Sequence, residues 1–132
     1  MPGHGPTGFA FNRTRTTYLA TELVIARTHW SRFRGLMATD PARFRRGQGL
    51  WITPSRGVHT FAMRFPIDVV YLDQKRLVIH IEEGLKPWRM AAIRIRAASV
   101  LELPIGTVHD SRTALGDQVD ILMERPLHRE AA

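Results

Sequence analysis

The stretch IDVVYLDQKRLVIHI, residues 67–81, decides the class of fold that we expect for this chain of 132 residues. Residues 67–72 and 77–81 are rich in Val, Ile and Tyr, which are typical of β-strands. The polar residues between these two runs, Asp73 to Arg76, have the length and composition of a hairpin loop. The stretch therefore predicts two neighbouring antiparallel strands.

Further short strands are predicted on both sides of this hairpin. Eight prolines and ten glycines punctuate the chain, which favours many short elements over long helices. Apolar or alternating runs that end at Pro, Gly or Asp are read as strands. These strands are expected at residues 18–26, 49–53, 58–63, 91–96, 100–103 and 118–124.

Two short helices are also predicted. The first begins after the N-cap residue Thr28 and ends before Pro41. Its apolar face consists of Trp30, Phe33, Leu36 and Met37. The second covers residues 107–115. Because strands and helices do not alternate regularly, we predict an α+β, β-rich domain with a mostly antiparallel sheet that is curled or barrel-like.

The length and composition predict one domain over residues 18–125. Residues 1–17 lack a hydrophobic period and are expected to be a flexible leader, and residues 126–132 a short tail. No apolar run approaches the roughly 20 residues of a membrane span. The first 17 residues also lack the apolar core of a signal peptide, so the expected location is cytoplasmic.

The chain is strongly basic, with 19 Lys and Arg against 12 Asp and Glu and a formal net charge of +7. Nearly all of these cations are arginines; only Lys75 and Lys86 are lysines. Such a charge is compatible with nucleic acid, acidic proteins or small anionic ligands. The arginines are scattered rather than gathered in one run, which favours a solvated surface over a dedicated basic tract.

Several functional classes receive no support from the sequence. The chain has no Cys, which excludes disulfides and thiol catalysis. The six histidines show neither H-x-H nor H-x-x-x-H spacing, so no metal site is predicted. No phosphate-binding loop, nucleophile elbow or dinucleotide fingerprint is present, so no cofactor is expected.

Four short motifs occur in a fixed order along the chain. They are RGLM at residues 34–37, HTFAMRFPIDVVYLD at 59–73, VLELPIG at 100–106 and GD at 116–117. In order and spacing they resemble the DUF192 family, also called UPF0127, over roughly residues 21–122. The resemblance implies a compact β-rich domain with short helices and no established activity.

The strongest candidate site is a polar cluster around the break at Pro66. It consists of His59, Thr60, Met63, Arg64 and Asp68. One interpretation is a pocket that holds an anion or a sugar. The alternative is structural: Asp68 would accept hydrogen bonds from backbone amides or pair with an arginine, and His59 would be a partly buried ring.

Four other residues are candidates for binding or chemistry. Arg34 suits bidentate binding of an anion, or of a carboxylate that fixes its helix on the sheet. Trp88 and Arg89 suit stacking on a sugar or base, unless Trp88 closes one end of a barrel. Glu102 lies in an apolar strand and, together with Asp68, would make an acid pair for glycoside chemistry.

Three functional hypotheses follow. The first is a small-ligand-binding or accessory module, built around the polar cluster. The second is a nucleic-acid-binding domain, in which arginines 32, 43, 45, 46, 94 and 96 gather on one face near Trp88. The third is a hydrolase that uses Asp68 or Glu102 with His59. We favour the first hypothesis, because the motifs centre on polar and turn residues while most of the arginines lie outside them. A non-enzymatic role is expected over catalysis.

Overall fold

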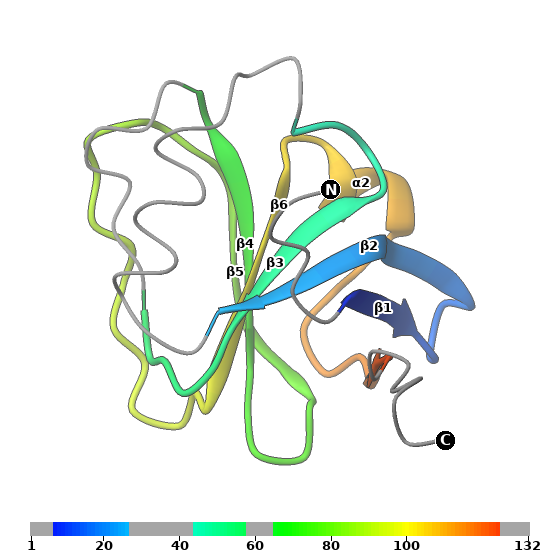
Figure 1. Cartoon of the computed structure of the whole chain (residues 1–132). Coiled ribbons are helices and arrows are strands. Elements are labelled where there is room, and N and C mark those ends of the chain that lie inside the picture. The colour runs from blue at the N-terminus through cyan, green and yellow to red at the C-terminus, as the bar shows by residue number, and fades with distance from the viewer. Residues whose placement is uncertain (1–6, 27–43, 58–64, 125–132) are drawn as a thin grey trace, which may run out of the picture.

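The predicted hairpin is present and lies at one edge of a seven-stranded sheet (Figure 1). The computed structural model describes residues 7–26, 44–57 and 65–124. The strands in this part of the chain are β1 (Thr7–Asn12), β2 (Thr17–Ala26), β3 (Gln48–Ile52), β4 (Ile67–Leu72), β5 (Val78–Leu85), β6 (Ser99–Pro104) and β7 (Val119–Met123). One short helix, α2 (Thr107–Ser111), connects β6 to β7.

The sheet order is β5-β4-β6-β3-β2-β1-β7. Every neighbouring pair is antiparallel except β2 and β3, which run parallel. The predicted β-rich and mostly antiparallel sheet is therefore confirmed. Strands β4 and β6 are neighbours that lie between β5 and β3, and both are fully buried along their length.

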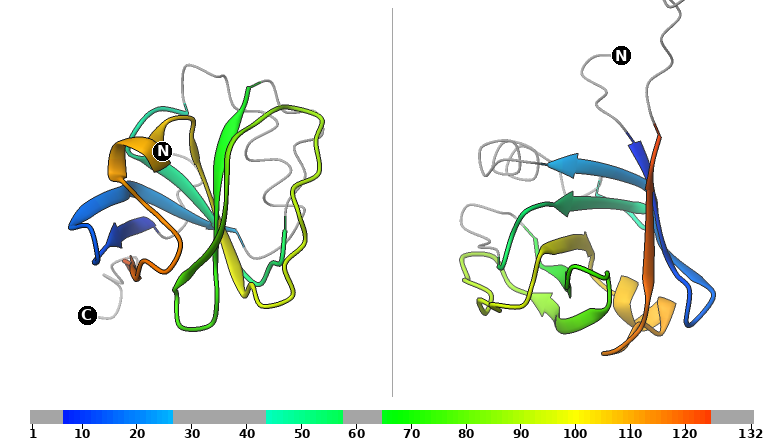
Figure 2. Two further views of the ribbon diagram at one scale, coloured as in Figure 1. Left: turned by 180° about the vertical axis from the view of Figure 1, so that it is seen from behind. Right: turned by 90° about the horizontal axis from the view of Figure 1, so that it is seen from below.

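The sheet curls until its two edge strands meet at one end (Figure 2). Leu77 and Gln118 form a bridge between the two edges. Beside it the Val78 N–H donates to the Asp117 carbonyl at 2.9 Å, and the Gly116 N–H donates to the Val78 carbonyl at 2.8 Å. The result is a partly closed barrel, as the sequence predicted.

Side chains alternate between the two faces of the curled sheet, as the strand period of two requires. The inner cluster includes Leu19, Leu23, Val70, Leu101 and Leu103, together with Val108 of α2. The outer cluster contains the alternate residues of the same strands, which are Leu50, Ile52, Ile67, Val69, Tyr71 and Val100. Both faces of the central strands are thus covered by apolar side chains.

The expectation of a flexible leader over residues 1–17 is wrong for residues 7–17. Residues Thr7–Asn12 form β1, which pairs with both β2 and β7. The rings of Phe9 and Phe11 pack edge-on against Tyr18 at centroid distances of 5.8 and 4.9 Å. Strand β1 is stabilised by its pairing with β2 and β7 and by these ring contacts, all of which form only in the folded chain. The local composition of residues 7–12 therefore does not indicate a strand.

Two other predicted elements differ in the structure. Residues 91–96 form a loop rather than a strand, and their alternating Ile and Arg side chains are all exposed. The predicted helix over residues 107–115 ends at Ser111, since Arg112 adopts a left-handed backbone with φ 58°. The predicted helix before Pro41 and the predicted strand at 58–63 lie outside the described residues.

Within the described ranges, no helix has the length and apolar character that crossing a membrane requires.

A buried polar network joins the start of the sheet to its last turn. The amide of Asn12 donates to the Thr113 hydroxyl at 3.0 Å and to the Asp117 carboxylate at 2.9 Å. The same carboxylate accepts from Arg15 at 3.0 Å and from the Ala114 N–H at 2.9 Å. Burial opposes ionisation, but the hydrogen bonds from Arg15, Asn12 and Ala114 prevail and lower the pKa of Asp117 below 3.8.

Replacing Asp117 by Asn should lower the free energy of unfolding by about 2–4 kcal/mol near neutral pH, because a buried carboxylate acceptor is lost. A lowered folded-state pKa stabilises the fold above the ordinary pKa, and this contribution is lost as pH falls through the folded value. The difference in free energy of unfolding between D117N and the unchanged protein, measured by urea unfolding, should therefore decrease as the pH becomes acidic. The exposed Asp120, which pairs with Arg13, provides the control D120N, with little effect expected. A difference that is independent of pH would contradict this account.

Candidate functional site

The Asp68 carboxylate is a structural centre of the fold. It lies on β4 and is 1% exposed. Its Oδ1 accepts from the Gly84 N–H at 2.8 Å, and its Oδ2 accepts from the N–H groups of Gly106 at 3.1 Å and Val108 at 3.0 Å. One side chain thus ties together the end of β5, the turn after β6 and the first turn of α2.

Two of the segments that bind Asp68 do so through glycines. Gly84 and Gly106 have φ values of 65° and 90°, a left-handed backbone that costs glycine little. A Cβ at Gly106 would also collide with the guanidinium of Arg46. Since Asp68 accepts hydrogen bonds from three main-chain N–H groups, the structural interpretation fits this residue.

Glu102 points to the opposite face of the sheet from Asp68. Residues directly opposite on antiparallel strands share a face, and neighbours along a strand do not. Asp68 is opposite Leu103, whereas Glu102 is opposite Val69 and Leu50. The predicted acid pair of Asp68 and Glu102 is therefore wrong, although Glu102 is itself fully buried.

A second polar cluster shares the outer face with Glu102. Val69 is opposite Glu82 on one side and Glu102 on the other, so the two glutamates flank one strand on the same face. The ring of His80 lies edge-on to Tyr71 at 4.8 Å, and its Nε2 is 2.9 Å from the Glu82 carboxylate. The sequence analysis missed Tyr71, His80 and Glu82, because only the strand register shows that they share a face.

The environment of Tyr71 disfavours its ionisation. The phenol donates a hydrogen bond to the Ala92 carbonyl at 2.5 Å. Burial, and then the negative charge of Glu82, raise the pKa of Tyr71 to about 12, while the Arg94 charge acts in the opposite direction. The Tyr71 hydroxyl is therefore a neutral donor at physiological pH.

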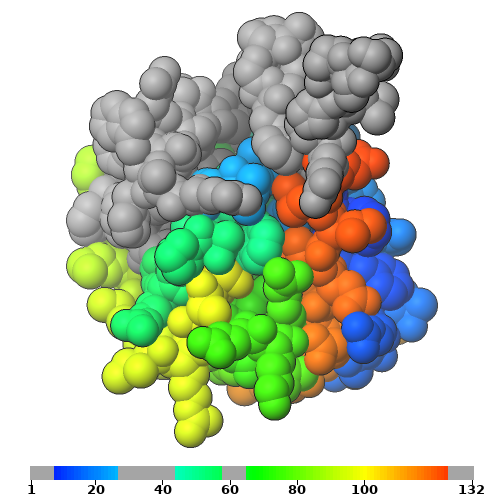
Figure 3. Space-filling view, turned by 60° about the horizontal axis from the view of Figure 1, so that its bottom comes forward, coloured from blue at the N-terminus to red at the C-terminus, as the bar shows by residue number. Residues whose placement is uncertain are grey.

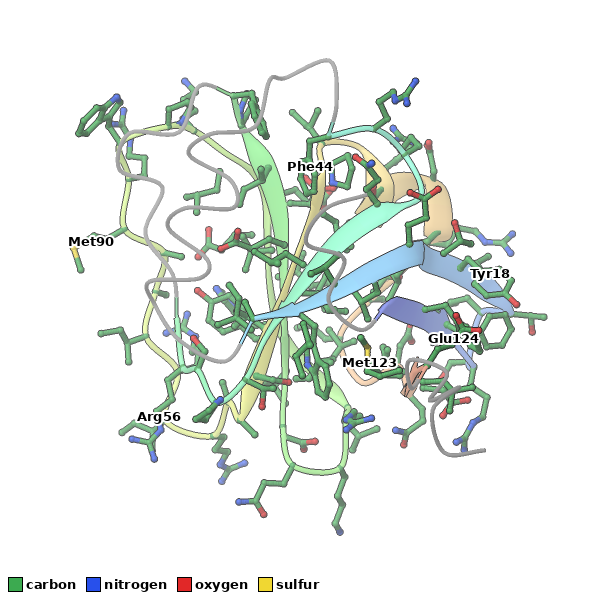
Figure 4. All side chains as sticks on the ribbon, in the orientation of Figure 1. Tyr18, Phe44, Arg56, Met90, Met123 and Glu124 are labelled. Carbon is green, nitrogen blue, oxygen red and sulfur yellow. The ribbon has the colours of Figure 1, made fainter. Side chains whose placement is uncertain are left out.

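An open cleft of about 870 Å³ lies at the other end of β6, next to the hairpin loop between β4 and β5. Three cations line it, Arg56, Lys75 and Arg96. In Figure 3 the segments that carry them meet on one face of the molecule, and Figure 4 shows the Arg56 side chain pointing outward from its loop. Among the described residues that line it, the one carboxyl is that of Asp73, which already accepts from the N–H groups of Lys75 and Leu77, both at 2.9 Å.

Several arginines elsewhere on the surface have carboxylate partners. Arg13 pairs with Asp120, Arg15 with Asp117 and Arg46 with Asp110. No ion pair within the described residues involves the three cations of the cleft. The cleft is therefore a local excess of positive charge, beyond the general basicity of the chain.

The described arginines do not gather on one face near Trp88. Arg46 donates to the carbonyl of Ile105, just beyond the end of β6, whereas Arg94 and Arg96 precede its start. Arg45 lies beside Arg46. Arg45 and Arg46 are therefore near the end of β6, and Arg94 and Arg96 are near its start. The gathering expected for a nucleic-acid-binding face is therefore absent from the residues that the structure describes.

Trp88 and Arg89 lie in the loop between β5 and β6. Trp88 is 62% exposed, so it does not close an end of the barrel. Its backbone has φ 62°, which is rare for a residue with a side chain. Arg89 is exposed as well.

The remaining sequence candidates, which are Arg34, His59, Thr60, Met63 and Arg64, lie outside the described residues. Among the residues that are described, no group of three or more His, Asp or Glu could hold a metal ion.

The chain is a β-rich α+β domain built around one partly closed sheet. The buried Asp68 fixes the end of β5, the turn after β6 and the first turn of α2. The model of the DUF192 family, described as Uncharacterized ACR, matches residues 10–121. The chain belongs to this family, also called UPF0127, whose members are uncharacterised.

Relatives and solved structures agree with this assignment. A UPF0127 protein of Thermococcus sibiricus is 31% identical over 114 residues, which are 83% of this chain and 71% of that protein. A structure of unknown function from Novosphingobium aromaticivorans has a TM-score of 0.70 at 20% identity, over 91% of this chain and 89% of that one. A putative transcription regulator from Sinorhizobium meliloti has a TM-score of 0.71 at 23% identity, over 90% and 98%. At these identities the two structures show the fold alone.

Replacing Asp68 by Ala should lower the free energy of unfolding by about 3–5 kcal/mol, because three N–H groups lose a charged acceptor. The matched control is D73A, which removes a carboxylate that accepts two N–H bonds at the surface. We expect about 1 kcal/mol for this control, measured by urea unfolding. Equal losses in the two variants would show that Asp68 does not hold the three segments together.

The raised pKa of Tyr71 can be measured directly. The chain has two tyrosines, so the phenolate absorbance of Y71F and of the control Y18F assigns each titration step. The step near 12 should disappear in Y71F and remain in Y18F. Because the folded-state pKa is raised, the stability from burying the neutral phenol is present below about pH 10 and is lost as pH rises toward 12. A step near 12 that survives in Y71F would overturn the assignment.

Proposed function

We propose that this protein is a binding module for a small anionic ligand, and that the ligand occupies the cleft lined by Arg56, Lys75 and Arg96. The observation that carries the proposal is the absence of a carboxylate partner for these three cations within the described part of the chain, in a cleft of about 870 Å³. This volume is within the range of small-molecule sites.

The chemistry of the cleft suits phosphate, sulfate or carboxylate groups. Two guanidinium groups provide planar, forked donors that match such oxyanions, and Lys75 adds a mobile point charge. Ile95, Ala97 and Ala98 supply apolar wall beside the cations. A ligand with an anionic group and a short carbon frame would satisfy both parts of the lining.

The cations reach the cleft from three separate segments. Arg56 follows the turn at Pro54, Lys75 lies in the hairpin loop, and Arg96 lies in the loop before β6. Main-chain hydrogen bonds join these segments: the Arg94 N–H donates to the Arg56 carbonyl at 2.9 Å, and the Ala98 N–H donates to the Leu72 carbonyl at 2.8 Å. Because these hydrogen bonds already hold the loops in place, a ligand has to order less of the backbone when it binds.

The other two hypotheses have less support. One structural neighbour is called a putative transcription regulator, but the arginines of this chain divide between opposite ends of β6. The hydrolase hypothesis uses Asp68 or Glu102 with His59, which lies outside the described residues, and the Asp68 carboxylate already accepts three main-chain N–H groups.

The test is thermal unfolding of the full chain with phosphate, sulfate, citrate, sugar phosphates and neutral sugars. An anion at about a hundred times its dissociation constant stabilises by about 2.7 kcal/mol, or roughly 10 °C for a domain of this size. The shift should vanish in the triple variant R56Q/K75Q/R96Q.

The control R13Q/R45Q/R112Q removes the same charge from exposed residues outside the cleft and should keep the shift. A shift that both triple variants lose would indicate general basicity rather than a site. A shift with neutral sugars alone, or with no compound at all, would contradict the proposal.

A further inference from the structure

The loop between β5 and β6, residues 86–98, exposes large apolar side chains. Trp88 is 62% exposed, Met90 67%, Ile93 65% and Ile95 81%. Figure 4 shows Met90 pointing away from the sheet. Scattered single apolar residues on a surface are ordinary, but four large ones within one loop mark a contact surface.

The loop is firmly attached to the sheet, so this exposure does not come from a detached segment. Ala91 and Ala97 are buried at 5% exposure each and belong to the outer apolar cluster. The Ala92 carbonyl accepts from the Tyr71 hydroxyl, and the Ala97 N–H donates to the Arg94 carbonyl at 3.0 Å. The small side chains therefore face inward and the large ones face solvent, the reverse of what burial alone would select.

Cations alternate with these apolar side chains. The loop carries Lys86, Arg89, Arg94 and Arg96, all exposed, and residues 84–101 contain no Asp or Glu. Tryptophan and arginine side chains suit the boundary between water and acyl chains, and polybasic segments are attracted to anionic lipids. Exposed aliphatic side chains such as Ile93 offer nothing for stacking on bases, so the composition favours a lipid surface over nucleic acid.

We propose that the 86–98 loop docks the protein peripherally on an anionic lipid surface. Trp88, Met90 and Ile93 enter the boundary of the acyl chains, and the guanidinium groups of Arg89 and Arg94 contact the phosphates. The left-handed backbone at Trp88, φ 62°, is of the kind that is concentrated at ligand-contacting segments. This surface borders the cationic cleft at Ile95 and Arg96 but does not depend on it.

The experiment is co-sedimentation of the full chain with vesicles of phosphatidylcholine alone and of phosphatidylcholine mixed with equal phosphatidylglycerol. We expect binding to the mixed vesicles only, weakened by salt. The variant M90S/I93S keeps every charge and should bind roughly tenfold more weakly or worse. The control L115S/L122S changes two exposed leucines elsewhere, 65% and 58% exposed, and should bind as the unchanged protein does.

A second readout assigns the contact to Trp88. Lipids with brominated acyl chains should quench part of the tryptophan fluorescence, and W88F should lose that part. Equal binding by M90S/I93S and the unchanged protein, or no binding to either vesicle, overturns the proposal. The anion-dependent thermal shift of the cleft should persist in M90S/I93S, so failure of one proposal is distinguishable from failure of the other.

Discussion

The Asp68 carboxylate is the interaction on which the rest of this fold depends. It sits on a central strand and accepts hydrogen bonds from the N–H groups of Gly84, Gly106 and Val108. These groups belong to a strand end, a turn and a helix start, which are places where the backbone lacks ladder or helical partners. A buried charged acceptor that satisfies all three fixes the path of the chain from β5 to α2.

The two faces of the curled sheet carry different polar residues. Asp68 faces the interior of the curl, where α2 covers it, whereas Glu102 faces outward with Tyr71, His80 and Glu82. Residues adjacent in a motif thus serve different faces. In the outer polar cluster a neutral phenol, an imidazole and carboxylates share one face of the sheet, and the cations of the cleft lie beyond the start of β6.

The surface near the start of β6 combines two properties that do not stabilise a folded domain. Within the described part of the chain no ion pair involves the cations of the cleft, and the adjoining loop turns its large apolar side chains toward solvent while Ala91 and Ala97 are buried. Repulsion between unpaired cations and the exposure of apolar area both lower the stability of the folded state. A partner that binds at this surface would offset both costs. A small anion and an anionic lipid surface are the two partners that these features match.

Strands with a local signal could be predicted from the sequence. The β-branched runs at 67–72 and 77–81, with their polar loop, predicted the hairpin, and turn residues bounded most other strands. Strand β1 is recognised only in the folded chain, where it pairs with β2 and β7. The same holds for the loop at 91–96, whose alternating Ile and Arg side chains resemble a strand but are all exposed. The tertiary structure also decided the cleft, because Arg56, Lys75 and Arg96 converge only through long-range pairing. Local propensity acts over a few residues, whereas register and burial depend on contacts between distant segments.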